Sequence, residues 1–335
     1  MTTSPEPSVT LHDAMTAAAL RDVHPRLHEW YDDPTLAMNM RAHLAEGAGW
    51  IGDEEFGAAY RDGVAVIDVP EALDWANRVI PLPGDGWAVT GIRFRNRDLS
   101  KPFVEIVAHS AGGASPDEHW HTMADEIGRA YAPFTPGKLQ VFAADPERTV
   151  ETFTRLGWRA EVDMYLVAGQ IDDLRARPRV ARFDDVTLIA VSPERAAEVA
   201  GTAYAALASI TPGSALWASP QTLDDLAAYA QEGLLFGIEV DERLTGVVAA
   251  TRRDACGMTG FSVEEIVLDA GHRGRRLAGA VLQQLIDRLP AAADDVLWGT
   301  IHPDNAPSLR NALGVGREIV GANLWIEPPG WPRWN

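Results

Sequence analysis

Two segments of this 335-residue chain share one pattern, and this repeat constrains the fold more than any other feature. The first segment is 138–167 and the second is 296–326. Each has a strand of β-branched and aromatic residues, a turn with Pro and Asp, a short helix, a glycine and a second strand. A repeated ending of this kind predicts two copies of one α/β fold, with domains at 1–175 and 176–335.

The C-terminal half has a regular succession of helix and strand signals. We expect the order β α α β β β α β α β, in which helical spacing of leucines or strand-type runs define each element. The expected strands are 186–192, 234–240, 244–251, 262–268, 296–301 and 318–326, and the expected helices are 193–207, 223–231, 278–289 and 307–313. In the N-terminal half, 87–94 and 102–108 are expected to be strands and 118–131 a helix.

Composition limits the classes of function. Hydrophobic residues make up 46% and charged residues 23%, which is typical of a soluble globular protein. We expect no membrane span and no secretory signal at the polar N-terminus, and the single Cys256 favours the cytoplasm. A net charge of −19 argues against nucleic acid and suits a cationic substrate such as an amine, although acidic surfaces also serve solubility.

A basic, glycine-containing turn joins an expected strand to an expected helix. The strand 264–268 leads into His272–Gly279, where the helix begins. The first N–H groups of a helix lack internal partners and carry partial positive charge, so they suit a pyrophosphate. Gly274 leaves room for it, and three arginines add positive charge. The simpler alternative is a solvated basic turn. The three arginines are Arg273, Arg275 and Arg276.

Residues 264–279 resemble the central motif of the GNAT acyltransferase superfamily, Arg/Gln-x-x-Gly-x-Gly/Ala. Arg273 and Ala278 match its first and last positions, whereas Arg276 stands where the family usually has Gly. Residues 302–314 resemble the later motif of the family, and the resemblance spans about 185–327. It implies an α/β (α+β) fold of two tandem GNAT-like domains, each a mixed, mainly antiparallel sheet flanked by helices.

The N-terminal copy lacks the basic turn. After the strand that ends near His109, the loop 110–117 holds no arginine. We therefore expect this half to be a degenerate copy that serves as a scaffold.

The resemblance implies an N-acetyltransferase or short-chain N-acyltransferase that moves an acyl group from acyl-CoA to the amine of a small molecule. The amine attacks directly in a ternary complex, and no metal is expected. The pyrophosphate would lie on the amides of 274–279, and the pantetheine along 264–268, with a backbone N–H near Val267 or Leu268 polarising the thioester. The implied coenzyme A residues are Ile266, Val267, Leu268, Arg273, Gly274, Arg275, Arg276, Leu277, Ala278, Gly279 and Asn305.

Three residues are candidates for the chemistry. Glu264 corresponds to a strand glutamate that serves as base in some family members, and simple alternation would turn Glu265 to the opposite face of the strand. A surface carboxylate or ion-pair partner is the alternative for both. The helix 307–313 lacks the tyrosine that often protonates the thiolate, and Ser308 is its only hydroxyl.

Two other functions remain open at this point. The chain could bind acyl-CoA without transfer, as a sensor or scaffold, because Arg276 and the missing tyrosine depart from the family pattern. It could instead acetylate a protein. We expect a monomer or homodimer.

Overall fold

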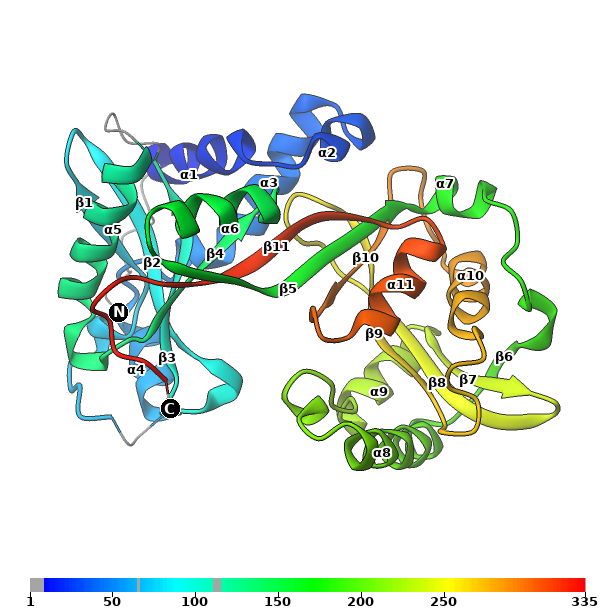
Figure 1. Cartoon of the computed structure of the whole chain (residues 1–335). Helices are drawn as coiled ribbons and strands as arrows, with labels where there is room; N and C mark the ends of the chain where they lie inside the picture. Colours follow the sequence, from blue (N-terminus) through cyan, green and yellow to red (C-terminus); the bar gives the residue numbers. More distant parts are fainter. Residues whose placement is uncertain (1–8, 65–66, 111–115, 335) are drawn as a thin grey trace. The chain divides into compact units, whose positions relative to one another are not determined.

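The computed structural model describes residues 9–64, 67–110 and 116–334 (Figure 1). The chain divides into two compact units. Unit 1 comprises Met1–Asp163 and Gly321–Asn335, and unit 2 comprises Met164–Val320. The N-terminal residues that we expected to lack a secretory signal lie outside the described ranges.

Unit 2 is built on a mixed sheet with the strand order β5-β10-β9-β8-β7-β6. Neighbouring strands pair antiparallel except β9 and β10, which are parallel. The strands are β5 (Arg159–Gln170), β6 (Thr187–Ala190), β7 (Leu235–Val240), β8 (Arg243–Arg252), β9 (Gly260–Leu268) and β10 (Val296–Ile301).

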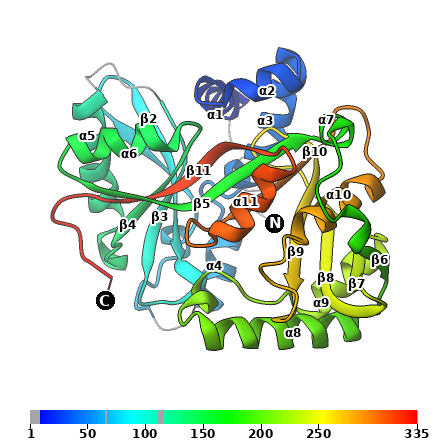
Figure 2. The same ribbon diagram turned by 45° about the vertical axis from the view of Figure 1, so that its right-hand side comes forward.

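Helices cover both faces of this sheet (Figure 2). On one face, α10 buries Leu282 and Leu285 against the strands, and α7 adds Leu174 to the same core. On the other face, α8 and α9 pack Ala200 and Leu226 against the sheet. The helices are α7 (Ile171–Ala176), α8 (Pro193–Ile210), α9 (Leu223–Gln231), α10 (Ala278–Arg288) and α11 (Ala306–Gly314).

Unit 1 repeats the central pairing pattern of unit 2. Its strand order is β1-β2-β3-β4-β11, and only β3 and β4 are parallel. Its strands are β1 (Arg78–Leu82), β2 (Gly86–Phe94), β3 (Pro102–His109), β4 (Lys138–Ala143) and β11 (Glu318–Glu327). Its helices are α1 (Val9–Arg21), α2 (Pro25–Trp30), α3 (Asp33–Gly49), α4 (Glu54–Asp62), α5 (Pro116–Ala130) and α6 (Pro146–Arg155).

A β-bulge also recurs at the same place in both units. The register of β2 and β3 shifts at Val89/Thr90, and that of β8 and β9 shifts at Ala249/Ala250. In each unit the bulge lies in the antiparallel pair next to the parallel pair. The expected fold class, tandem α/β domains with mixed and mainly antiparallel sheets flanked by helices, is confirmed.

Two long strands pass from one unit to the other. The chain leaves unit 1 within β5, between Asp163 and Met164, and returns to it within β11, between Val320 and Gly321. β5 follows β4 and α6 in sequence but pairs with β10, whereas the end of β11 pairs with β4. Each unit therefore takes its last strand from the other half of the sequence. The predicted boundary at 175 falls within α7, and the division into two copies at that residue stays a prediction.

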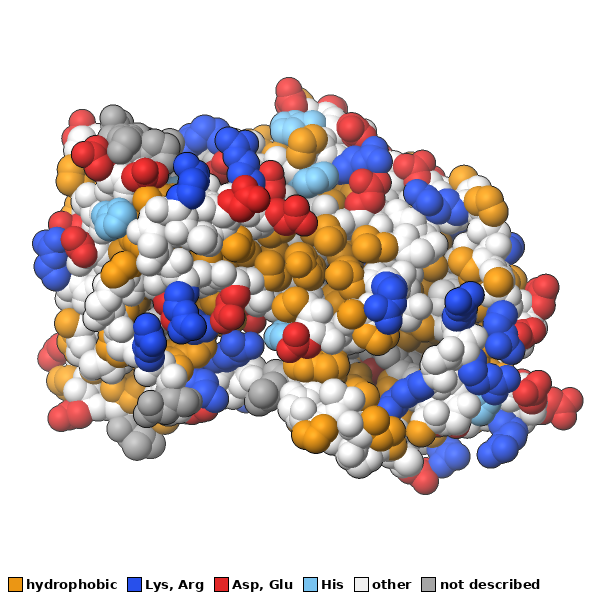
Figure 3. All heavy atoms as spheres, viewed as in Figure 1, with side chains coloured by type: hydrophobic (Ala, Val, Ile, Leu, Met, Phe, Trp, Pro, Cys, Tyr) orange, Lys and Arg blue, Asp and Glu red, His pale blue; other side chains and the backbone are white. Residues whose placement is uncertain are grey.

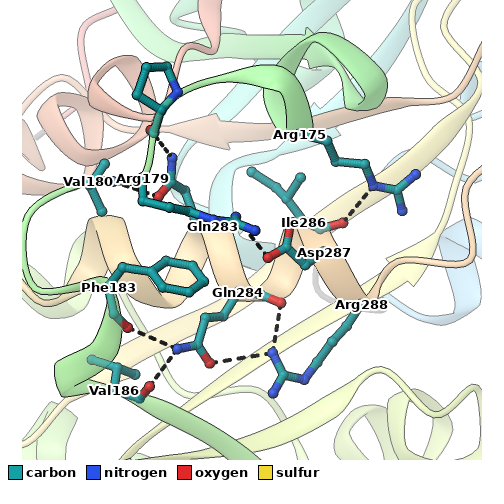
Figure 4. A network of polar contacts seen from close by, with 11 residues as sticks. Arg175, Arg179, Val180, Phe183, Val186, Gln283, Gln284, Ile286, Asp287 and Arg288 are labelled. Carbon is teal, nitrogen blue, oxygen red and sulfur yellow. Dashed lines mark hydrogen bonds and ion pairs between the residues drawn. The ribbon is translucent and has the colours of Figure 1, made fainter.

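The segment that leads from α7 to β6 is fixed onto α10 by two buried glutamines (Figure 4). Gln283 accepts a hydrogen bond from the Val180 N–H and donates to the Pro178 carbonyl, at 2.8 and 2.9 Å. Gln284 donates to the carbonyls of Phe183 and Val186. Because buried polar groups are costly when unpaired, these contacts hold α10 in one position relative to the segment.

Candidate functional site

β9 and β10 stop pairing part-way along their length. Among the described residues their pairs run from Val296–Gly260 to Trp298–Ser262, although β9 continues to Leu268 and β10 to Ile301. The first position beyond the last pair is Val263 opposite Gly299. From there on, the edge of β9 that faces β10 has no strand partner among the described residues. Side chains already engage two backbone groups of this stretch, because the Glu264 carbonyl accepts from Gln221 Nε2 at 2.9 Å and the Ile266 N–H donates to the Glu265 carboxylate. The remaining backbone groups of this edge are available to a ligand.

The bulge in β9 lies beside this opening and changes the direction of its side chains. Ala249 pairs with Glu265 and Ala250 with Val263, so Glu264 is the extra residue. Val263 and Ile266 contact the α10 side of the sheet. The interactions of both glutamates lie on the side of α8 and α9, as described below. Our expectation that Glu264 and Glu265 lie on opposite faces is therefore wrong, because the bulge interrupts the two-residue alternation.

Glu265 is enclosed in a hydrogen-bond network. Its side chain is buried, its Oε1 accepts from the Tyr204 hydroxyl at 2.7 Å, and its Oε2 accepts from the Gln221 N–H at 3.3 Å. Burial raises the pKa of Glu265 to about 7, and hydrogen bonds from Tyr204 and from the backbone N–H groups of Gln221 and Ile266 oppose the shift. Tyr204 and Gln221 give no signal in the sequence, because their roles depend on the position of α8 and of the loop before α9.

Glu264 is less constrained. Its Oε1 is buried without a hydrogen-bond partner, and the nearest cation, Nη1 of Arg253, lies 3.9 Å away. That distance is too long for a hydrogen bond. Burial raises the pKa of Tyr229 to about 12, and the charge of Glu264 is the second largest cause of this shift. The Glu264 carboxylate therefore lies near α9, which carries Tyr229. A buried carboxylate oxygen without a partner is costly, so this atom is suited to a donor from a ligand.

The turn after β9 is held by Asp269 and Arg273. The Asp269 carboxylate accepts from the backbone N–H of His272 at 3.0 Å and contacts the His272 ring at 2.7 Å. Arg273 donates through Nε to the Leu268 carbonyl at 2.9 Å and through Nη2 to the Ala203 carbonyl. Two bonds to backbone carbonyls show that Arg273 fixes the turn against α8. Its expected contribution of positive charge to a phosphate stays a prediction.

The start of α10 has no side-chain cap. Its N-cap residue is Leu277, and its first turn holds no acidic residue. By contrast, Ser192, Thr222 and Asn305 cap α8, α9 and α11 with their side-chain oxygens. The first N–H groups of α10 are therefore available to an anion.

Two residues of this turn adopt left-handed backbone angles, Gly274 with φ of 73° and Arg276 with φ of 61°. A left-handed conformation favours glycine, which explains why the family consensus has Gly where this chain has Arg276. The departure at Arg276 therefore concerns the side chain, and the backbone still makes the turn.

Basic side chains gather around this helix start (Figure 3). Arg182 lies in the segment bound to α10 and donates to the Arg275 carbonyl at 3.2 Å. Val180 of the same segment lies near Gly279. Arg182 also pairs with Asp185 at 2.6 Å, so the positive charge at this helix start comes mainly from Arg275 and Arg276, although the whole chain carries a net charge of −19. Nothing in the sequence indicates that Arg182 lies at the turn, because 93 residues separate Arg182 from Arg275.

Asn305 and Ser308 lie at the start of α11. Asn305 Oδ1 accepts from the Ser308 N–H at 3.3 Å, so the Asn305 side chain serves as the helix cap. A contact of Asn305 with coenzyme A, and a proton-donating role for Ser308, stay predictions.

In the part of the chain that the structure describes, no group of three or more His, Cys, Asp or Glu side chains is arranged to hold a metal ion. None of the described helices combines the length and apolar character that a membrane span requires. In unit 1, residues 111–115 of the loop that corresponds to the basic turn lie outside the described residues. The degenerate character of unit 1 therefore stays a prediction.

The fold and the site define unit 2 as an α/β domain in which an uncapped, locally basic helix start lies beside an open strand edge. Residues 204–314 match the family model for the acetyltransferase (GNAT) family. The chain therefore carries a GNAT acetyltransferase domain and is an acyl-CoA-dependent acyltransferase. No curated protein matches the chain.

Several solved structures are similar to the chain at low identity. A GCN5-related N-acetyltransferase from Sphaerobacter thermophilus is 14% identical over 75% of this chain and 79% of its own, with a TM-score of 0.47. A GNAT acetyltransferase from Colwellia psychrerythraea is 12% identical over 72% of this chain and 85% of its own, with a TM-score of 0.44. A tandem GNAT protein from the clavulanic acid biosynthesis pathway is 14% identical over 72% of this chain and 79% of its own, with a TM-score of 0.40.

Proposed function

We propose that unit 2 transfers a short acyl group from acyl-CoA to the amine of a small, cationic molecule. The observation that carries this proposal is Glu264, whose buried Oε1 lacks a partner beside the place where β9 and β10 part. An amine bound there would supply the missing donor. The carboxylate would then accept the proton that the nitrogen loses as it attacks the thioester.

Acyl-CoA would occupy the open edge of β9 and the start of α10. Its pyrophosphate would accept hydrogen bonds from the free N–H groups of α10. The nearby Arg182, Arg275 and Arg276 would supply positive charge. The pantetheine would pair with the backbone of β9 beyond Ser262, and a backbone N–H of that edge would polarise the thioester carbonyl. The main contribution of the protein would be to hold the amine and the thioester in contact.

Glu265 is the weaker candidate for the base. Both of its oxygens already accept hydrogen bonds, from Tyr204 and Gln221, and its side chain is only 2% exposed. We propose that Glu265 instead holds α8 and the loop before α9, and thereby shapes the surface on which the amine binds.

The charges around this surface favour a cationic acceptor. Asp225 and Glu232, as well as Glu264, act on the pKa of Tyr229, whereas Arg253 is the only cation in that group. An excess of carboxylates attracts an ammonium and repels an anionic substrate. This supports a polyamine or amino sugar more than a carboxylic acid, and does not favour transfer to a specific protein.

The test is acyl transfer itself. The full chain is mixed with acetyl-CoA and a panel of cationic, neutral and anionic amines, and free thiol is followed. We expect thiol release that requires a cationic amine and falls about 100-fold or more in kcat in Glu264→Gln, because a general base typically contributes a factor of this size. Glu242→Gln, which removes an exposed carboxylate of the same unit, serves as the control.

Tight binding of coenzyme A without amine-dependent release of thiol would contradict the proposal and favour an acyl-CoA sensor. A loss of activity in Glu265→Gln that equals or exceeds the loss in Glu264→Gln would contradict the role of Glu264 as the base and favour Glu265.

A further inference from the structure

Arg317 is a buried cation that has no counterion among the residues described by the structure. The residue precedes β11 and is 3% exposed. Its Nη2 donates to the Val167 carbonyl of β5 at 2.8 Å, and its Nε is buried with no hydrogen-bond partner. Burial lowers the pKa of Arg317 to about 9, and burial is the sole cause of the shift among the described residues. Neither the fold nor the proposed acyl transfer accounts for such a charge.

The guanidinium lies where β9 and β10 part. A Cβ placed on Gly299 would lie 3.0 Å from Nη2 of Arg317 and 3.9 Å from the Val263 Cβ. Val263 and Gly299 are the first positions beyond the last pair of the two strands. The absence of a side chain at Gly299 allows the guanidinium to reach over β10 to this point.

The surroundings of Arg317 are largely apolar. Val167, Ile301 and Ala312 form a small core there, together with Leu309 of α11. The titratable groups nearby include Arg177, which lies against Gly316, then Tyr165, Arg310 and Glu318, and, on the far side of the sheet, Glu264 and Glu265. None of them contributes to the pKa shift of Arg317. An unpaired charge in such a place carries a large desolvation cost, which an anion would offset.

We propose that Arg317 stabilises the thiolate of coenzyme A as it leaves. This inference rests on the proposed function, since pantetheine that follows the open edge of β9 would bring the thioester to the point where the strands part. The amine nitrogen forms a bond to the carbonyl carbon, the carbon–sulfur bond breaks, and its electron pair stays on sulfur. The proton of the nitrogen goes to Glu264. The thiolate is paired with the guanidinium until it takes a proton from solvent.

This role would compensate for the tyrosine that is missing from α11. A cation aimed at a developing negative charge in a dry site needs no proton transfer to stabilise it. The alternative is that Arg317 has only a structural role, tying the start of β11 to β5 through the Val167 carbonyl.

The experiment compares the binding of coenzyme A with that of desulfo-coenzyme A, which lacks the sulfur, as a function of pH. The proteins are the full wild-type chain, Arg317→Met, Arg317→Lys and the control Arg310→Met, which removes an exposed arginine of α11. Met has a similar length and no charge, and replacing a buried unpaired charge by an apolar group is often tolerated. Lys keeps the charge.

We expect the wild type to prefer coenzyme A over the desulfo analogue, increasingly as the pH rises toward the pKa of the thiol. Arg317→Met loses this preference, Arg317→Lys retains part of it, and Arg310→Met keeps it. With a reactive amine, kcat of Arg317→Met falls about 100-fold, the size of effect seen when one charge-stabilising donor is removed. On the unmodified protein, the ultraviolet absorbance of the thiolate should develop at a lower pH for bound than for free coenzyme A.

A preference in Arg317→Met equal to that of the wild type, or a bound thiol that ionises at the same pH as the free one, would overturn the role of Arg317 while leaving the proposed acyl transfer intact. If the wild type binds neither ligand, both proposals fail. The absorbance measurement decides the matter even if Arg317→Met does not fold.

Discussion

At the scale of single residues, Glu265 couples stability to pH. Its pKa is raised from 4.5 to about 7, so the folded protein binds this proton more tightly than the unfolded chain does. The corresponding stabilisation is complete below the unfolded pKa and is lost as the pH rises through about 7. Above that pH, the folded state carries a buried carboxylate whose hydrogen bonds from Tyr204, Gln221 and Ile266 only partly offset its desolvation.

Glu265→Gln should therefore stabilise the protein above neutral pH and have little effect in acid. The shift corresponds to up to about 3 kcal/mol, because one pKa unit is about 1.4 kcal/mol. Gln keeps a carbonyl oxygen that can accept from Tyr204. Urea unfolding of both proteins on either side of pH 7 measures the difference, and Tyr204→Phe controls for the lost hydrogen bond. A difference that is the same at every pH would rule out the linkage.

The sequence identified the two glutamates but not their arrangement. Their position one after the other in a strand suggests opposite faces. The bulge decides otherwise, and it arises from the register of β8 against β9, which the local sequence does not encode. Arg317 gave no signal, because an arginine between a helix and a strand is usually exposed.

At the scale of elements, the start of α10 is the feature that the sequence predicted best. The basic turn, the glycine and the helix lie where the pattern placed them. The roles of individual side chains differ, since Arg273 is bound to backbone carbonyls of β9 and α8. Removing Arg273 would therefore disturb the turn itself, and a substitution in the helix gives a cleaner test of anion binding.

Gly279→Asp should weaken coenzyme A binding without destabilising the helix. A Cβ at this position meets only Val180, at 3.7 Å, so there is room for it. A carboxylate in the first turn interacts favourably with the helix dipole, by about 0.3–1 kcal/mol, but repels a pyrophosphate. We expect Kd for coenzyme A, measured by calorimetry, to rise at least about tenfold, in line with the loss of a charge-assisted contact.

Gly279→Asn is the matched control, because it has the same shape and no charge. Equal affinities of the Asp and Asn variants for coenzyme A would show that the pyrophosphate does not bind at the start of α10.

At the scale of the whole molecule, the exchange of β5 and β11 makes unit 1 depend on the end of the chain. Ala322 to Ile326 pair with β4, and Leu324 and Trp325 are buried there. Trp334 follows and donates to the Pro102 carbonyl at 3.0 Å. The tryptophans near the C-terminus thus pack back onto unit 1.

Truncation after Val320 should unfold unit 1 or leave it loosely packed. The chain would lose several buried side chains worth about 1.5–3 kcal/mol each, as well as the strand beside β4. Hydrogen exchange of β3 and β4 amides, followed with a dye that binds exposed apolar surface, measures the effect. Truncation after Pro328 keeps β11 complete and serves as the control. Unchanged protection of β4 in the shorter chain would contradict the assignment of this strand to unit 1.

The sequence by itself determined the succession of helices and strands from residue 186 onward, the repeated ending and the basic turn, whereas α1 to α4 and β1 were not predicted. These features depend on periodicity, caps and turn residues that lie close together in the chain. Both repeated endings supply a strand of similar character, so nothing local determines which one pairs with β4 and which with β10. Only the tertiary structure decided that exchange, the bulge at Glu264 and the burial of Arg317, because each depends on contacts between residues far apart in sequence.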